Sequence, residues 1–281
     1  MRIEVQQGSQ EWLSLRKKKI TATDAGIILG INPWKTKQML WQEKVGLKEP
    51  DKMNEKMARG ISLEPIALDA FCKTVGYKLS PTVLVHDSNS WAMASLDGMS
   101  ENGQLVEIKC GQKSYEQAKQ GVIPDYYYSQ MQHQMYVAGV KQMSYFCFNG
   151  EDGICLDTKL CQDYVDTMLH QEQEFYRQII EFEPPELTDK DYLNMENNKE
   201  WKKLSLQFQM IKSNQRSLEE LEQKTRQSLL ELSKMSNAKG CGITVKKVIL
   251  KGRIQMDQVP EDIKQSLEIY RSKSTESFRI I

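Results

Sequence analysis

The chain has 281 residues, of which 40% are hydrophobic and 27% charged, a balance typical of a globular protein with a substantial core. Lysine plus arginine and aspartate plus glutamate both number 38, and this neutrality excludes a uniformly basic nucleic-acid coat but not a local basic patch. No stretch approaches the roughly 20 apolar residues that span a bilayer. Residues 1–7 lack the apolar core of a signal peptide. We therefore expect a cytoplasmic protein with no membrane partner.

The cysteines and histidines exclude two kinds of cofactor. The six cysteines form no CxxC pair, and the three histidines are scattered along the chain. Neither a structural zinc site nor a four-thiolate iron–sulfur cluster has the ligand spacing it needs. We expect reduced thiols in or near the core.

Helical spacing predicts two short helices near the N-terminus. The first includes Trp12 and Arg16, and the second covers residues 25–29. Thr23 or Asp24 is expected to cap the second helix, because short polar side chains satisfy the free amide groups at a helix start.

The middle of the chain alternates between helical and strand patterns. Residues 54–75 predict a helix in which Pro65 lies in the first turn or at a bend. The elements expected after it are strands at 83–86, 91–96 and 105–109, a helix at 124–139, a hairpin of 143–149 and 154–157, and a helix at 160–182. This order predicts an α/β (α+β) protein with a mixed central sheet flanked by helices.

Pro184 and Pro185 mark the expected boundary between a core of residues 1–183 and an extension of residues 184–281. Beyond them, apolar residues recur at spacings of three and four, which predicts a C-terminal helical arm, as a hairpin or a short coiled coil. Polar residues interrupt the apolar seam, so we favour a helix packed within its own protein. They are Gln215, Glu222 and Thr225. The helix is expected to stop at 240–242, before a small β element of residues 243–250 and 253–256.

The segment from Ser95 to Lys109 carries the most chemical information. Side chains alternate along a strand, so Glu107 and Lys109 should share one face. A turn at 101–103 would place Asp97 across from Glu107. Two close carboxylates repel unless a cation lies between them, and hard oxygen ligands suit Mg²⁺, with Mn²⁺ as a substitute. The Ile108 carbonyl is a further potential ligand.

Such a site would cleave phosphodiesters. A metal-bound water becomes acidic enough to attack phosphorus, and Lys109 can hold or deprotonate that water. An Asp and an E-x-K strand are also common on protein surfaces. Here, however, the strand at 105–110 is flanked by apolar residues, where charged side chains are costly unless they serve a function.

Several stretches in order resemble the PD-(D/E)XK nuclease superfamily, and within it the lambda exonuclease / YqaJ-type phage recombinase family. The matching segments are Ser9-Gln10-Glu11-Trp12, 16–23, 58–65, Ser95-Leu96-Asp97-Gly98, Glu107-Ile108-Lys109 and Tyr127-Tyr128-Ser129-Gln130-Met131-Gln132. The resemblance covers roughly residues 8–180. It implies a restriction-endonuclease-like core.

The resemblance also implies roles for individual residues. Asp97, Glu107 and the Ile108 carbonyl would hold two Mg²⁺ ions, Lys109 would serve the attacking water, Glu64 would reach the metal shell, and Gln130 would orient groups near the scissile phosphate. Arg16, Thr23 and Ser95 would bind a terminal 5′-phosphate, for which a guanidinium and two hydroxyls are a suitable receptor. Thr23 replaces the family's usual serine but keeps the hydroxyl.

The function implied is a metal-dependent 5′→3′ exonuclease that digests double-stranded DNA ends to mononucleotides. It would leave 3′ single-stranded tails for a single-strand annealing protein or recombinase, in the bacterial host cytoplasm if phage-encoded. A ring-shaped homotrimer is also implied. The alternatives are an endonuclease of the same superfamily and a non-catalytic protein that binds DNA ends. A helicase-associated nuclease with an iron–sulfur cluster is disfavoured by the cysteine pattern.

Overall fold

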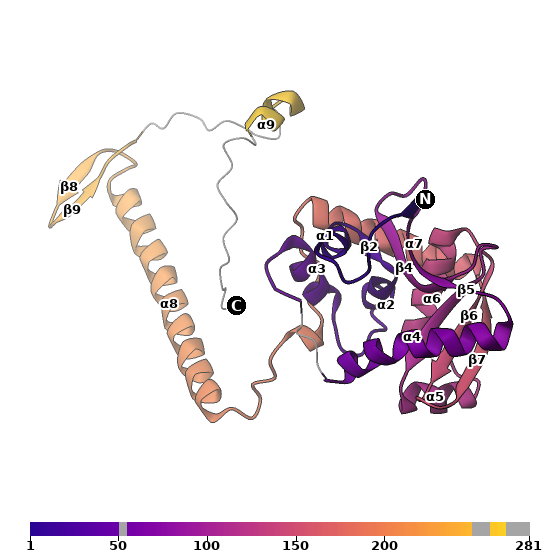
Figure 1. Cartoon of the computed structure of the whole chain (residues 1–281). Coiled ribbons are helices and arrows are strands. Elements are labelled where there is room, and N and C mark those ends of the chain that lie inside the picture. Colours follow the sequence, from indigo (N-terminus) through magenta and orange to yellow (C-terminus); the bar gives the residue numbers. More distant parts are fainter. Residues whose placement is uncertain (51–54, 249–258, 268–281) are drawn as a thin grey trace. The chain divides into compact units, whose positions relative to one another are not determined.

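A computed structural model describes residues 1–50, 55–248 and 259–267 of the chain (Figure 1). The chain divides into two compact units, Met1–Asn194 and Met195–Ile281. The first unit is built on a mixed sheet of seven strands with helices against it, as the sequence predicted. Among the described residues, no helix is both long and apolar enough to cross a membrane.

The sheet has the strand order β1-β3-β4-β5-β6-β7, and β2 pairs with β4 beside this path. Its strands are β1 (Arg2–Ile3), β2 (Ile20–Thr21), β3 (Ser80–Val85), β4 (Ala92–Met99), β5 (Leu105–Cys110), β6 (Gln142–Phe148) and β7 (Gly153–Lys159). The β5–β6 and β2–β4 pairs are parallel, and the other pairs are antiparallel. A parallel pair needs a crossover connection, and two helices between β5 and β6 supply it.

Helices cover both faces of the sheet (Figure 1). They are α1 (Gln10–Lys18), α2 (Ala22–Ile28), α3 (Lys37–Val45), α4 (Glu55–Val75), α5 (Gln112–Lys119), α6 (Asp125–Ala138) and α7 (Gln162–Ile180), followed by a short 3₁₀ turn η1 (Asp189–Asp191). Leu105 of β5 packs with Met131 of α6, whereas Val106 packs with Phe71 of α4. Because neighbouring residues of a strand face opposite ways, α4 and α6 lie on opposite faces of β5.

Two helix details correct the sequence analysis. Helix α2 starts at Ala22, and its N-cap is Thr21 rather than Thr23 or Asp24. Asp24 lies in the first turn, where its Oδ2 accepts the Thr21 N–H at 2.8 Å. Pro65 lies in the interior of α4 and not in its first turn, so of its two expected positions the bend is the one that remains. Neither α3 nor α5 was predicted as a separate helix, because both are short and α5 contains few apolar residues.

A buried ion pair joins two of the helices to the sheet. His133 of α6 and Glu172 of α7 are both 0% exposed, and Nδ1 lies 2.8 Å from Glu172 Oε1. The other ring nitrogen lies 3.2 Å from the Met93 carbonyl oxygen of β4. Burial alone would lower the His133 pKa, but the Glu172 carboxylate outweighs it and the pKa is raised. Since both ring nitrogens face acceptors, the imidazolium form fits this position.

The second unit contains a long helix and a small hairpin. Its described elements are α8 (Lys199–Leu232), β8 (Ala238–Gly240), β9 (Ile243–Val245) and α9 (Glu261–Leu267). The expected stop at 240–242 is wrong, because α8 ends at Leu232 and Gly242 lies in the β8–β9 turn with φ +82°. The strand expected at 253–256 lies outside the described residues.

Helix α8 also differs from the expected arm. It is one uninterrupted helix of 34 residues, so it is not a helical hairpin. None of its residues is buried against the described elements of its own unit.

Candidate active site

The site is built where strands β4 and β5 separate. Gly98 pairs with Val106 and Met99 with Leu105, and the backbone pairing of the two strands ends there. Asp97 does not share one face with Glu107 as predicted: Leu96 packs on the α6 face with Leu105 and Met131, and Asp97 lies on the α4 side beside Glu64. Beyond Gly98 the backbone ladder is replaced by a side chain, because the Ile108 N–H donates to Asp97 Oδ2 at 2.7 Å.

An irregularity in the neighbouring strand pair helps to aim Asp97. Ser80 of β3 pairs with Met99, but Thr82 pairs with Leu96, so the register shifts by one residue opposite Asp97. A bulge of this kind bends a strand and re-aims a side chain. Pro81 lies at the shift. Because proline has no backbone N–H, no donor is left without a partner where the pairing is interrupted.

Glu107 is the most deeply enclosed charge of the site, with a side chain only 1% exposed. Its Oε1 accepts a hydrogen bond from Gln130 Nε2 at 2.6 Å and another from Lys109 Nζ. Its Oε2 accepts from Gln134 Nε2 at 2.5 Å. Glu107 and Lys109 therefore share the face toward α6, as the strand alternation predicted. Two amides and an ammonium compensate for taking this carboxylate out of water.

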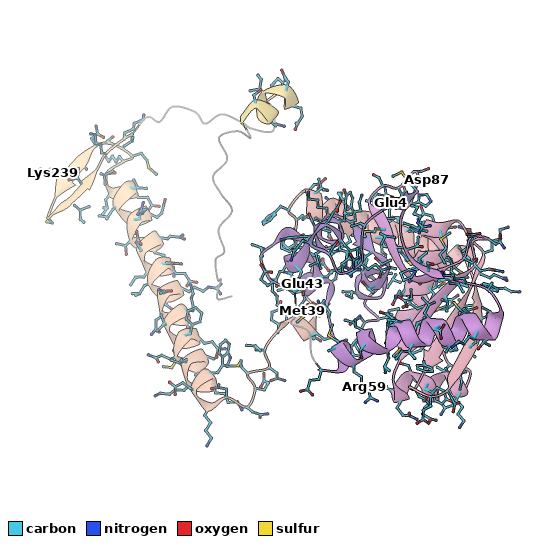
Figure 2. All side chains as sticks on the ribbon, in the orientation of Figure 1. Glu4, Met39, Glu43, Arg59, Asp87 and Lys239 are labelled. Carbon is cyan, nitrogen blue, oxygen red and sulfur yellow. The ribbon has the colours of Figure 1, made fainter. Side chains whose placement is uncertain are left out.

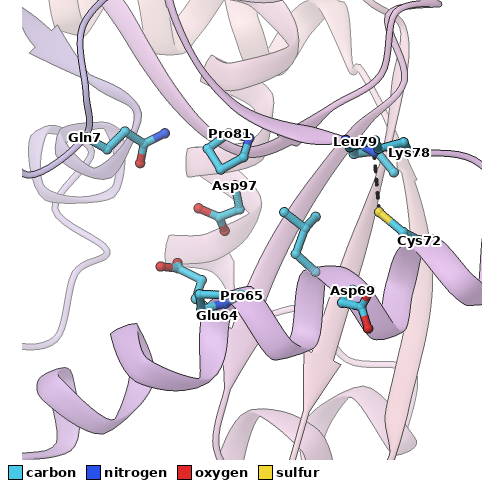
Figure 3. A pocket seen from close by; sticks show the side chains of 10 residues that line it. Gln7, Glu64, Pro65, Asp69, Cys72, Lys78, Leu79, Pro81 and Asp97 are labelled. Atoms are coloured by element: carbon cyan, nitrogen blue, oxygen red, sulfur yellow. Dashed lines mark hydrogen bonds between the residues drawn. The ribbon is translucent and has the colours of Figure 1, made fainter.

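Asp97 and Glu64 meet on the side of α4. Figure 3 shows the two carboxyl groups pointing toward each other across one end of a pocket of about 470 Å³. Burial raises the Asp97 pKa well above its usual range, and the nearby Glu107 charge raises it further. The Glu64 pKa is also raised, mainly by burial. Both shifts act in favour of the neutral acids, and a cation between the two carboxylates would act against them.

Lys109 is held in its charged form. Burial lowers its pKa, but the carboxylates of Glu107 and Asp97 outweigh burial, and the net pKa is raised. The ammonium also lies 4.7 Å from the centre of the Tyr127 ring, a cation–π contact. The adjacent Cys110 is no nucleophile, because burial and the charges of Glu64 and Asp97 raise its pKa to about 11.

The three residues expected to bind a phosphate lie in one connected group. Arg16 Nη2 donates to Thr23 Oγ1 at 3.0 Å, and the guanidinium lies 4.5 Å from the centre of the Trp12 ring. Trp12 Nε1 in turn donates to Ser95 Oγ at 2.9 Å. Burial lowers the Arg16 pKa, which Asp24 partly offsets. Arg16 and Thr23 thus touch directly, while Ser95 joins them through the indole.

A buried ion pair between α2 and α3 lies next to this group and holds it in place. Lys44 Nζ of α3 lies 2.6 Å from Asp24 Oδ2 of α2, and both side chains are 7% exposed. The same ammonium donates to the backbone carbonyls of Arg16 and Lys19, each at 2.7 Å. Burial would raise the Asp24 pKa, but Lys44 and Arg16 outweigh it and the pKa is lowered. The pair therefore ties α1, α2 and α3 together.

Sequence analysis assigned no site role to four residues that position the site. Gln134 binds both Glu107 and the Ser95 carbonyl, the latter at 3.3 Å, and so bridges the gap between β4 and β5. Its signal was available, because it follows Gln130 by one helical turn. The others are Trp12, Lys44 and Tyr127. For them only contacts between distant segments reveal a role.

The donor set suits a divalent cation only in part. Among the described residues, no group of three or more His, Cys, Asp or Glu side chains is gathered closely enough to hold a metal. Asp97 and Glu64 nevertheless form a buried oxygen pair whose raised pKa values show that a cation would stabilise both anions. Their chemistry fits Mg²⁺ or Mn²⁺ better than zinc. Glu107 already has three hydrogen-bond donors.

The fold is that of the PD-(D/E)XK class, a mixed central sheet flanked by helices, with acids on β4 and β5 and a further acid on a helix. Residues 11–141 match the YqaJ-like viral recombinase domain family, which confirms the resemblance seen in the sequence.

Relatives agree with this assignment. The chain is 29% identical to the YqaJ protein of Bacillus subtilis (strain 168) over 208 residues, which are 67% of this chain and 65% of that protein. In fold it is similar to an alkaline exonuclease (LHK-Exo) from Laribacter hongkongensis, with a TM-score of 0.56 and 22% identity over 62% of this chain and 94% of that one. A structure of LHK-Exo in complex with dAMP gives a TM-score of 0.55 at 21% identity, with the same coverage.

Proposed function

We propose that this protein is a Mg²⁺-dependent 5′→3′ exonuclease acting on the ends of linear double-stranded DNA. The observation that carries the proposal is the convergence on β4 of two groups: the charged cluster around Asp97 and the Arg16–Thr23–Ser95 group. The YqaJ-like domain and the fold shared with an alkaline exonuclease support it. The non-catalytic alternative predicts a defective charge cluster, whereas here every position of the cluster is filled.

The chain's own residues would hold and orient the reacting groups. Asp97 and Glu64 are the residues that would bind the cation, which supplies an acidic water and offsets charge on the phosphoryl oxygens. Gln130 and Gln134 fix the Glu107 carboxylate. Because the Lys109 pKa is raised, its ammonium suits donating a hydrogen bond to the water or to the developing phosphorane, rather than removing a proton.

The spacing along β4 suggests the size of the product. Ser95 and Asp97 are two residues apart, which in a strand is about 6.6 Å. That distance is comparable to the separation of neighbouring phosphates in one DNA strand. A 5′-terminal phosphate near Ser95 would therefore leave the next phosphate near Asp97. Cleavage there releases a mononucleotide and leaves a 3′ single-stranded tail.

The experiment that tests the function uses linear duplex labelled at either the 5′ or the 3′ ends, with and without Mg²⁺. We expect the 5′ label to be released at once as a mononucleotide and the 3′ label to stay on a long strand, only with the metal. Covalently closed circular duplex should remain intact. Cutting of the closed circle would show an endonuclease instead, and release of the 3′ label first would reverse the polarity.

Replacing Arg16 by Gln is expected to abolish the preference for phosphorylated 5′ ends. Charge-assisted hydrogen bonds contribute about 1.5–3 kcal/mol, so kcat/KM on 5′-phosphorylated duplex should fall by roughly 10- to 100-fold. The rate on 5′-hydroxyl duplex should change little. Lys18→Gln, on the exposed side of the same helix, is the matched control. An equal loss on both kinds of end would contradict a phosphate-binding role.

The partners and assembly follow from the same proposal. The 3′ tails would be substrates for a single-strand annealing protein or recombinase. The homotrimer implied by the resemblance remains a prediction, which sedimentation of the full chain with and without duplex DNA would check.

A further inference from the structure

We propose that α8 forms an antiparallel, two-stranded coiled coil with α8 of a second copy of this chain. At 1.5 Å per residue the helix is about 50 Å long, and side chains project from all around it (Figure 2). Large apolar side chains are left in water: the exposed fractions of Trp201, Leu204 and Leu218 are 55%, 53% and 66%. A long apolar stripe of this kind indicates an interaction surface.

The stripe follows a heptad repeat. With Trp201 at position a, the successive a and d residues are Trp201, Leu204, Phe208, Ile211, Gln215, Leu218, Glu222, Thr225, Leu229 and Leu232. This strict alternation of three and four residues is the repeat by which two helices pack along a common seam. Polar residues within such a seam restrict the orientation of the helices, and Glu222 is the most restrictive of them.

Orientation is decided by Glu222. In a parallel pair, Glu222 would face Glu222 of the partner subunit inside the seam, where like charges repel. In an antiparallel pair every a residue meets a d residue. Full overlap sets Trp201 against Leu232 of the partner subunit, and Glu222 against Ile211 of the partner subunit. Within its own helix Glu222 bonds Arg226 at 2.8 Å, so its charge stays compensated.

The charge distribution agrees with the antiparallel orientation. Residues 199–216 contain five basic side chains and one acidic one, and residues 217–232 contain four acidic and two basic ones, so the halves carry +4 and −2. Antiparallel pairing sets the basic half against the acidic half. It also brings Lys212 beside Glu219 of the partner subunit, and twofold symmetry repeats this contact. Parallel pairing would set Lys212 and Glu219 beside neutral Gln207 and Asn214.

Charge-reversal variants of the full-length protein test this pairing by sedimentation. Lys212→Glu and Glu219→Lys should each raise the dissociation constant of the α8-dependent association roughly tenfold, since each creates two like-charge contacts. The double variant should restore the dissociation constant to near that of the unchanged protein, because the two charges are exchanged and attract again. Glu220→Lys, on the outer face of the helix, is the matched control and should have little effect. Single reversals without effect, or a double variant that is not restored, would overturn the proposal.

Cysteine cross-linking tests the orientation separately, whatever the nuclease unit assembles into. Ile211→Cys/Glu222→Cys should form disulfide-linked dimers that join peptide 204–212 to peptide 217–224 in a tryptic digest. Glu222→Cys alone should not link through position 222. Efficient linkage of the single variant would show a parallel pair. Absence of any α8 linkage in the purified protein would overturn the pairing. Neither outcome depends on nuclease activity.

Discussion

Replacing Asp97 by Asn should abolish nuclease activity and yet make the metal-free protein more stable. The loss of rate should be at least about 10³-fold, because a metal-bound water and its charge compensation contribute several kcal/mol. The gain in stability follows from the raised Asp97 and Glu64 pKa values. An amide carries no charge, can still accept the Ile108 N–H, and can donate to Glu64.

The pH dependence of this effect has a definite sign. Because the folded pKa of Asp97 is raised, its favourable contribution is complete below the unfolded pKa of about 3.9 and is lost as pH rises through the folded value. The melting temperature of Asp97→Asn should therefore exceed that of the unchanged protein at pH 8, and the two should converge near pH 4.

Magnesium should reverse the order of the two melting temperatures. A ligand that binds only the folded state stabilises it by mass action, so Mg²⁺ should raise the melting temperature of the unchanged protein but not that of Asp97→Asn. Asp157→Asn, an exposed change of the same chemistry on β7, is the matched control for both measurements. A magnesium-induced shift of equal size in Asp97→Asn would show that the metal binds elsewhere.

Replacing Lys44 by Met should destabilise the protein by about 3–5 kcal/mol at neutral pH. The substitution leaves the Asp24 carboxylate buried without its cation, and it deprives the Arg16 and Lys19 carbonyls of their donor. Chemical denaturation at pH 7 measures the change. The deficit should shrink toward acidic pH, because protonated Asp24 has no charge to compensate.

Two further variants show whether burial causes the effect. Asp24→Asn/Lys44→Met should be more stable than Lys44→Met, since it removes the unpaired charge. Lys73→Met breaks the Lys73–Asp69 pair, whose separation is also 2.6 Å but whose side chains are 76% and 66% exposed. It should leave stability unchanged within error, because water screens exposed pairs. Equal losses from both pairs would mean that contact distance rather than burial sets their strength.

The helix–strand order and the acidic hairpin could be predicted from the sequence because their signals are local. Apolar periodicity marked α6 and α7, and strand alternation placed Glu107 and Lys109 on one face. Weak local signals gave weaker predictions: the cap of α2 was misplaced, and α3 and α5 were missed. The end of α8 was misjudged because the glycines at 240 and 242 belong to the β8–β9 hairpin that follows it, at the end of β8 and in the turn.

By itself the sequence determined the class of fold, the YqaJ-like resemblance, and the identity of the charged residues on β4 and β5. The tertiary structure alone decided how those charges are arranged: Glu107 under two glutamines of α6, Asp97 beside Glu64 of α4, and Arg16 above a buried Asp24–Lys44 pair. The reason is physical. Periodicity reports which face of an element is buried, whereas the protonation of a carboxylate depends on which distant side chains remove its water and which supply charge in return.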